Sequence, residues 1–169
     1  MSAASSRLIV GLCACAALAA SCVDPVHQGA VDALGPEVGG VSPGEFHRAG
    51  QPCTVCHQDS GPANIRFTVG GTIFYGPGKW IGAANTKVEM IDSAGSNFVA
   101  VTNCVGNFFV TPDVWNPAFP ILVQVQLPDG TVRKMHGQVG REGSCAGCHH
   151  DPAGSASPGI SRSRRFVPR

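Results

Sequence analysis

Two short segments of the chain carry the same arrangement of cysteine and histidine. Residues 53–57 read CTVCH and residues 145–149 read CAGCH, so their first cysteines stand 92 positions apart (145 minus 53). This spacing is that of covalent haem attachment: two thiols add across the two vinyl groups of one porphyrin, and the adjoining imidazole reaches the iron. The predicted haem-binding residues are Cys53, Cys56, His57, Cys145, Cys148 and His149.

Three other chemistries also use paired cysteines. A redox disulfide, as in thioredoxin-like proteins, does not require the adjoining histidine, and no βαβ pattern surrounds either pair. Four thiolates could hold a structural zinc, but a long strand-rich segment separates the pairs, and zinc leaves the two histidines unexplained. Two ordinary disulfides between near neighbours are the third alternative. Haem attachment explains every residue of the repeated pattern.

With these two motifs the chain resembles the small di-haem c-type cytochromes of bacterial cell envelopes. The resemblance implies two covalent haem cofactors, single-electron transfer with redox partner proteins of the envelope, and no catalysis. One alternative is an enzyme of the di-haem peroxidase type, which needs an open position on one iron and is a longer chain in the members of that family. Another is a β-sandwich interaction module with ancillary haem or structural zinc.

Each iron has two axial positions, and its motif fills one of them. His47 stands six residues before the first motif and His136 nine before the second, so each is close enough to fold over its own ring. A chain of ten residues can span up to about 33 Å. In multihaem cytochromes a histidine placed like His150, directly after the motif, often binds a neighbouring haem. Met135 is a further candidate and His27 a weaker one.

The amino terminus predicts export. Arg7 precedes the apolar run LIVGLCACAALAA, which is typical of a secretory signal peptide over residues 1–21. The run is shorter than the roughly 20 apolar residues that cross a membrane. The following LAASC resembles the lipobox of bacterial lipoproteins, which implies diacylation of Cys22 and a lipid anchor in the periplasm or outer membrane. Ala19 stands where lipoboxes usually have leucine, so signal cleavage without lipidation is the alternative.

Composition favours a mainly β domain. With 169 residues and 43% apolar residues the chain can build one core, and 22 glycines and 13 prolines favour short strands joined by turns. Its 12 Lys and Arg against 11 Asp and Glu leave nothing to recruit nucleic acid or an anionic membrane. Alternation of apolar and polar residues predicts an antiparallel β-sandwich of about seven strands, flanked by short haem-binding loop or helix segments. The predicted strands are residues 64–69, 71–75, 86–92, 97–102, 107–111, 120–127 and 131–135.

The strand region also resembles carboxypeptidase regulatory-like or transthyretin-like domains, in the stretch GGTIFYGPGKWIGAANTKVEMIDSAGSNFVAVTNCVGNFFV. That resemblance implies a non-catalytic module. Cys104 departs from the pattern and is expected to be a buried small apolar residue, with a free thiol able to form an intermolecular disulfide as the alternative. The predicted order after the signal peptide is a flexible tether (22–44), a first haem segment (45–63), the sandwich (64–135), a second haem segment (136–154) and a disordered basic tail (155–169).

Overall fold

The chain is mainly β in the computed structural model, which describes residues 24–37, 39–76 and 79–149. Eight strands in this part of the chain form antiparallel sheets: one of four strands in the order β5-β4-β7-β8, and the pairs β1-β6 and β2-β3. The bounds are α2 Pro25–Ala33, α3 Cys53–Cys56, β1 Val69–Thr72, β2 Phe74–Gly76, β3 Lys79–Gly82, β4 Lys87–Ile91, β5 Asn97–Val101, β6 Asn107–Val110, β7 Leu122–Gln126, β8 Val132–Lys134 and α4 Cys145–Cys148.

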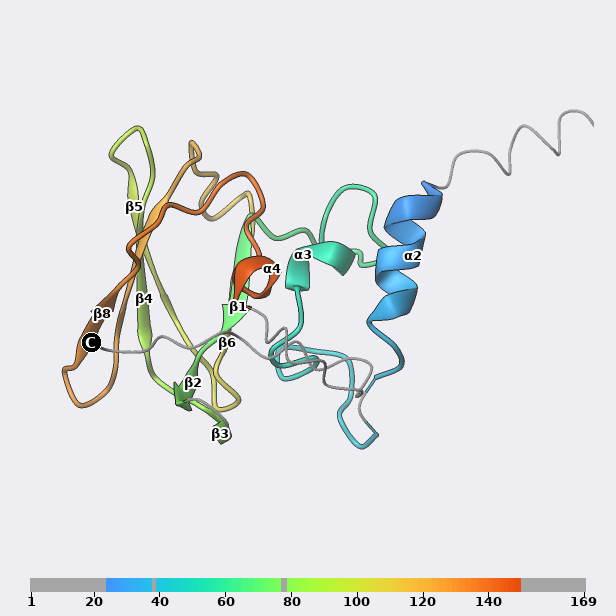
Figure 1. Cartoon of the computed structure of the whole chain (residues 1–169), viewed down its shortest axis with the longest axis horizontal. Helices are drawn as coiled ribbons and strands as arrows, with labels where there is room; N and C mark the ends of the chain where they lie inside the picture. The colour runs from blue at the N-terminus through green and yellow to red at the C-terminus, as the bar shows by residue number, and fades with distance from the viewer. Residues whose placement is uncertain (1–23, 38, 77–78, 150–169) are drawn as a thin grey trace, which may run out of the picture.

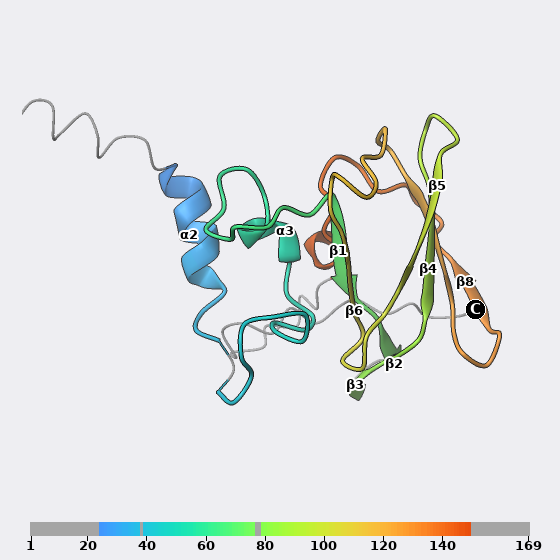
Figure 2. The ribbon, with the colours of Figure 1, turned by 180° about the vertical axis from the view of Figure 1, so that it is seen from behind.

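The four-stranded sheet and the β1-β6 pair face each other as two layers, which confirms the predicted mainly β, sandwich-like fold (Figures 1 and 2). α4 lies beside β1, and α3 and α2 follow on the side of β1 and β6 that faces away from the four-stranded sheet (Figure 1). The two cysteine motifs are therefore at the same end of the molecule. None of the described helices has the length and apolar character needed to cross a membrane.

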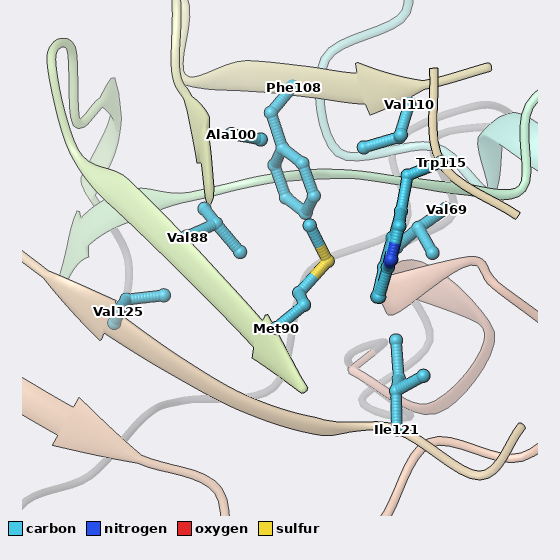
Figure 3. Close-up of a cluster of buried hydrophobic side chains, with 9 residues drawn as sticks. All are labelled: Val69, Val88, Met90, Ala100, Phe108, Val110, Trp115, Ile121 and Val125. Atoms are coloured by element: carbon cyan, nitrogen blue, oxygen red, sulfur yellow. The ribbon is translucent and has the colours of Figure 1, made fainter. Parts of the chain in front are cut away.

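The core lies between the two layers and takes side chains from both (Figure 3). β4, with the sequence KVEMI, alternates exposed and buried residues, so that Val88 and Met90 point inward. Full burial of a side chain of the size of Met90 stabilises the fold by about 1.5–3 kcal/mol. Trp115 enters from a loop and donates its Nε1–H to Ser96 Oγ at 3.0 Å. The core residues are Val69, Val88, Met90, Ala100, Phe108, Val110, Trp115, Ile121 and Val125.

A buried carboxylate, Asp92, organises the turn between β4 and β5. Its Oδ1 accepts hydrogen bonds from the backbone N–H groups of Ala94 (3.0 Å) and Ser96 (2.8 Å), and its Oδ2 accepts one from Ala118 (2.9 Å). The bond from Ala118 is the largest of the causes that lower the pKa of Asp92, because each of these donors favours the charged form. Asp92 therefore has a structural role.

The strand prediction was wrong at the start of the sandwich. The strand expected at 64–69 begins only at Val69, and the one expected at 71–75 covers the end of β1 and the start of β2. Only Thr68 of the residues just before Val69 bonds to a strand, through its N–H to the carbonyl of Val110 (2.8 Å), whereas the N–H of Phe67 donates to the carbonyl of His57 in the first motif (2.9 Å). β3 was not predicted. The strands expected at 86–92, 97–102, 107–111, 120–127 and 131–135 correspond to β4, β5, β6, β7 and β8.

Residues 25–33 form a helix within the segment that was predicted to be an extended tether. Asp24 is the N-cap and accepts a hydrogen bond from the N–H of Val26 (2.9 Å), while Pro25 occupies the first turn. The sequence did not reveal α2 because the helix is short and has no buried residue. It therefore shows no sustained apolar stripe with helical period.

Candidate functional site

The two cysteine motifs adopt the same backbone structure. α3 and α4 are each a single helical turn that ends at the histidine of the motif. The N–H of that histidine donates to the carbonyl of the motif's first cysteine, at 3.0 Å for His57 and 2.9 Å for His149. The backbone angles of the two histidines are also similar, φ −99° and ψ 46° against φ −89° and ψ 57°. Two segments far apart in the chain thus present their thiols and imidazoles on equivalent backbones.

Strand β1 brings these two turns together. A Cβ atom at Gly70 would lie 3.2 Å from the Cβ of Cys53, and one at Gly71 would lie 2.7 Å from the Cβ of Cys145. Successive residues of a strand face opposite sides of the sheet. The first cysteines of the two motifs therefore lie against opposite faces of the same two glycines. The N–H of Gly70 also donates to the carbonyl of Gly143 (2.9 Å), which holds the second motif at the edge of β1.

The first cysteine of each motif is a neutral thiol. Burial raises the pKa of Cys53 to about 11 and that of Cys145 to about 12. Redox-active cysteines act as thiolates, so these surroundings do not favour a redox disulfide. Within the described residues no group of three or more His, Cys, Asp or Glu side chains is arranged to hold a metal ion. The free cysteines of the described chain are Cys53, Cys56, Cys104, Cys145 and Cys148.

The imidazole of His57 is held in the form that binds a metal. Its Nδ1 lies 2.7 Å from the carbonyl oxygen of Ile65, which accepts the Nδ1–H and leaves the lone pair on Nε2. The ring stacks on Phe67 with centroids 3.9 Å apart, and Phe67 stacks on Phe109 at 4.6 Å. Burial lowers the pKa of His57, which favours the neutral ring. These residues fit the proximal ligand of a haem iron.

The structure brings His47 to the first motif. Its ring centroid lies 5.9 Å from that of His57. The Nδ2 of Asn107 donates to the carbonyls of His47 (3.0 Å) and Glu45 (3.1 Å), so the sandwich holds this loop. The N–H of Gly44 donates to Nδ1 of His47 at 3.1 Å, which places the proton of the neutral ring on Nε2. Binding iron through Nε2 would therefore require His47 to release Gly44.

The structure does not bring His136 or Met135 to the motifs. His136 is exposed in the turn after β8, and the neighbouring Met135 donates its N–H to the carbonyl of Val123 (3.0 Å). Cys104 is exposed in the turn between β5 and β6, which corrects the expectation that it is buried. The predictions that lie outside the described residues are the signal peptide (1–21), Cys22, His150 and the tail (155–169).

Arg48 is a residue of the site that the sequence did not reveal. Its Nε bonds to Glu37 Oε1 (2.8 Å), its Nη1 to Gln51 Oε1 (2.8 Å) and its Nη2 to the carbonyl of Gly35 (3.0 Å). The guanidinium thus joins the segment after α2 to the loop that leads into the first motif. The only signal in the sequence was the position of Arg48 directly after His47, which does not predict these partners.

Comparisons of this chain with protein-family models, curated proteins and solved structures found no match. The class of protein is therefore inferred from the two motifs and from their arrangement around β1.

Proposed function

We propose that this protein is a c-type cytochrome that carries two covalent haems and transfers single electrons in the bacterial cell envelope. The observation that carries the proposal is the contact of both Cys-x-x-Cys-His turns with Gly70 and Gly71 of β1. Electron exchange between two cofactors requires that they lie close together. Attachment cysteines on the two faces of one strand support such an arrangement.

The residues of each motif have distinct roles in this proposal. Cys53 and Cys56 would hold the first haem through thioether bonds, and His57, oriented by Ile65 and Phe67, would bind its iron. When bound, haem supplies the iron that takes up and releases one electron. The second motif has the same backbone and the same three roles. The proposed role is therefore that of an electron carrier, with a di-haem peroxidase as the alternative.

The attachment test is an intact mass after denaturation, with the protein produced in a host that matures c-type cytochromes. We expect two added haems in the wild type and one in each double variant, C53S/C56S and C145S/C148S. C104S is the matched control and should retain both haems, because Cys104 lies in an exposed turn outside the motifs. A wild-type mass without haem would reject the proposal in favour of zinc or disulfides.

The proposal includes export and a lipid anchor at Cys22, which rest on the sequence LAASC after a short apolar run. Redox proteins of the envelope are the proposed partners, and the membrane is contacted only through the anchor. We expect Cys22→Ala to release the protein into the soluble fraction, whereas Cys104→Ala should remain with the membrane. Unchanged membrane association of the first variant would reject lipidation.

A further inference from the structure

Helix α2 packs against the first motif. It contacts α3, and the two helices lie side by side in both views of the chain (Figures 1 and 2). The segment that follows α2 is held by Arg48, and Gln51 adds a hydrogen bond from its Nε2 to the carbonyl of Leu34 (3.4 Å). α2 is therefore held next to the first motif. The side chains of α2 that face α3 border the site.

His27 is the side chain of α2 that reaches the first motif. Its Nδ1 lies 2.8 Å from the amide nitrogen of Gln58, the residue directly after His57. Its Nε2 is buried and has no hydrogen-bond partner. A buried polar nitrogen without a partner is costly, and in native proteins it calls for a ligand or a functional explanation.

The tautomer of His27 can match that of a metal ligand without any backbone movement. A half-turn of the Gln58 side-chain amide presents its oxygen to the ring, and this oxygen then accepts the Nδ1–H. The lone pair is left on Nε2, as in metal-binding histidines whose other nitrogen donates a hydrogen bond. His47, in contrast, must first release the N–H of Gly44.

The number of histidines available as axial ligands also points to His27. Two haems need four axial ligands, and the motifs supply His57 and His149. His136 follows β8, and β8 lies on the side of the sandwich away from α2 and α3 (Figure 1). Within the described residues, His27 and His47 are the histidines outside the motifs that lie at this end of the molecule.

We propose that His27 is an axial haem ligand at the first motif. The inference rests on the proposed cytochrome function. It assigns this ligand to the chain before the first motif, and it gives α2 the function of carrying it.

The test compares His27→Ala with the wild type by absorption and electron paramagnetic resonance of the oxidised protein. Alanine preserves the helix, so only the imidazole is lost. We expect one of the two haems to become high-spin and to bind carbon monoxide, and added imidazole to restore its low-spin spectrum. A purely structural role of His27 would not give rescue by imidazole. His136→Ala is the matched control and should keep both haems low-spin.

A second variant, His27→Met, covers the case in which the alanine variant does not accumulate. Methionine in place of histidine as an axial ligand should raise the midpoint potential of one haem and leave the other unchanged. Two low-spin haems with unaltered potentials in both variants would overturn the role of His27 and leave the cytochrome proposal standing. Absence of haem from the wild type would instead reject the proposed function itself.

Discussion

At the scale of single residues, the absence of side chains at two positions of β1 determines how closely the two motifs approach each other. Gly70 and Gly71 contact the first cysteine of one motif each. Any larger residue would occupy the space that these cysteines fill. The two positions are not equivalent, because the added atom would be closer to its neighbours at Gly71.

Gly71→Ala is expected to disturb the second motif. Its Cβ would lie 2.7 Å from both Cβ and Sγ of Cys145 and 3.2 Å from the ring of Phe108, so α4 or the core must shift. Overpacking of this kind costs about 1–3 kcal/mol. We expect a lower Tm by calorimetry and incomplete attachment of the second haem by intact mass.

Gly70→Ala is the matched control for that variant. Its nearest neighbours, Cβ and Sγ of Cys53, would be 3.2 and 3.5 Å from the new atom, which a small shift can accommodate. The decrease in Tm should therefore be smaller, with both haems attached. Equal stability and equal haem content of the two variants would contradict this account of β1.

Asp92 is expected to make stability depend on pH in the acid range. Hydrogen bonds from Ala118, Ser96 and Ala94 keep its pKa below the ordinary value of about 3.9. A depressed pKa in the folded state means that the stabilisation is complete above the ordinary pKa and is lost as the pH falls through the folded value. Wild-type Tm should therefore decrease below about pH 4, partly through this group.

Asp92→Asn is the variant that checks this effect. The asparagine keeps one oxygen for Ala94 and Ser96, but its NH₂ group would face the N–H of Ala118. We expect a lower Tm at pH 7 and a weaker dependence of Tm on pH between 3 and 5 than in the wild type. Parallel Tm curves for the two proteins over that range would show that Asp92 does not contribute.

At the scale of elements, α3 and α4 are single helical turns that cannot be stable alone. Their conformation depends on the segments that hold them. The loop before α3 bonds to the sandwich: the N–H of Gly50 donates to Thr72 Oγ1 (2.7 Å), and the Oγ1 of Thr72 donates to Asn107 Oδ1 (2.6 Å). Asn107 therefore links the start of β6 to the loop that carries His47.

Asn107→Asp is expected to loosen this loop. The change removes the two donors to the carbonyls of Glu45 and His47 and keeps the oxygen that accepts from Thr72. Two lost hydrogen bonds cost about 2 kcal/mol. Hydrogen exchange followed by mass spectrometry should show faster exchange in residues 44–51. Asn97→Asp, the same change at an exposed position of β5, should leave exchange there unaltered, and equal exchange in both variants would contradict the link.

At the scale of the whole molecule, the sandwich is a support on which two distant segments meet. β1 contacts both α3 and α4, while the four-stranded sheet closes the core behind it. The proposed electron carrier needs both irons closed to small ligands, since an open iron position would allow oxygen or peroxide chemistry. The spin state of the iron therefore distinguishes a carrier from a peroxidase.

We expect two low-spin ferric signals in the electron paramagnetic resonance spectrum of the oxidised wild-type protein. With two axial histidines on each iron, carbon monoxide and cyanide should bind slowly or not at all. The measurement needs no variant and uses the full chain as purified from membranes. A high-spin signal from one haem at full occupancy, together with turnover of peroxide, would replace the carrier with a di-haem peroxidase.

The sequence by itself determined the secondary structure wherever it depends on a pattern among residues close together in the chain. Period-two alternation predicted β4 to β7, each of which buries residues against the core, and it also predicted β8, which has no buried residue. The Cys-x-x-Cys-His spacing predicted two equivalent sites, and the structure gives both motifs the same single turn. α2 and β3 were missed because neither carries a regular apolar pattern over enough residues to be recognised.

Tertiary structure alone decided which residues meet. Nothing in the local sequence indicates that Gly70 and Gly71 receive cysteines 92 positions apart, since that contact requires β1 to lie between two loops that the sandwich positions. The partners of His27 and His57 are likewise non-local or come from irregular backbone, namely Gln58 and the carbonyl of Ile65. The spacing of residues within a motif determines its chemistry. The neighbours that orient its side chains come from other segments of the chain, and only the fold brings those segments together.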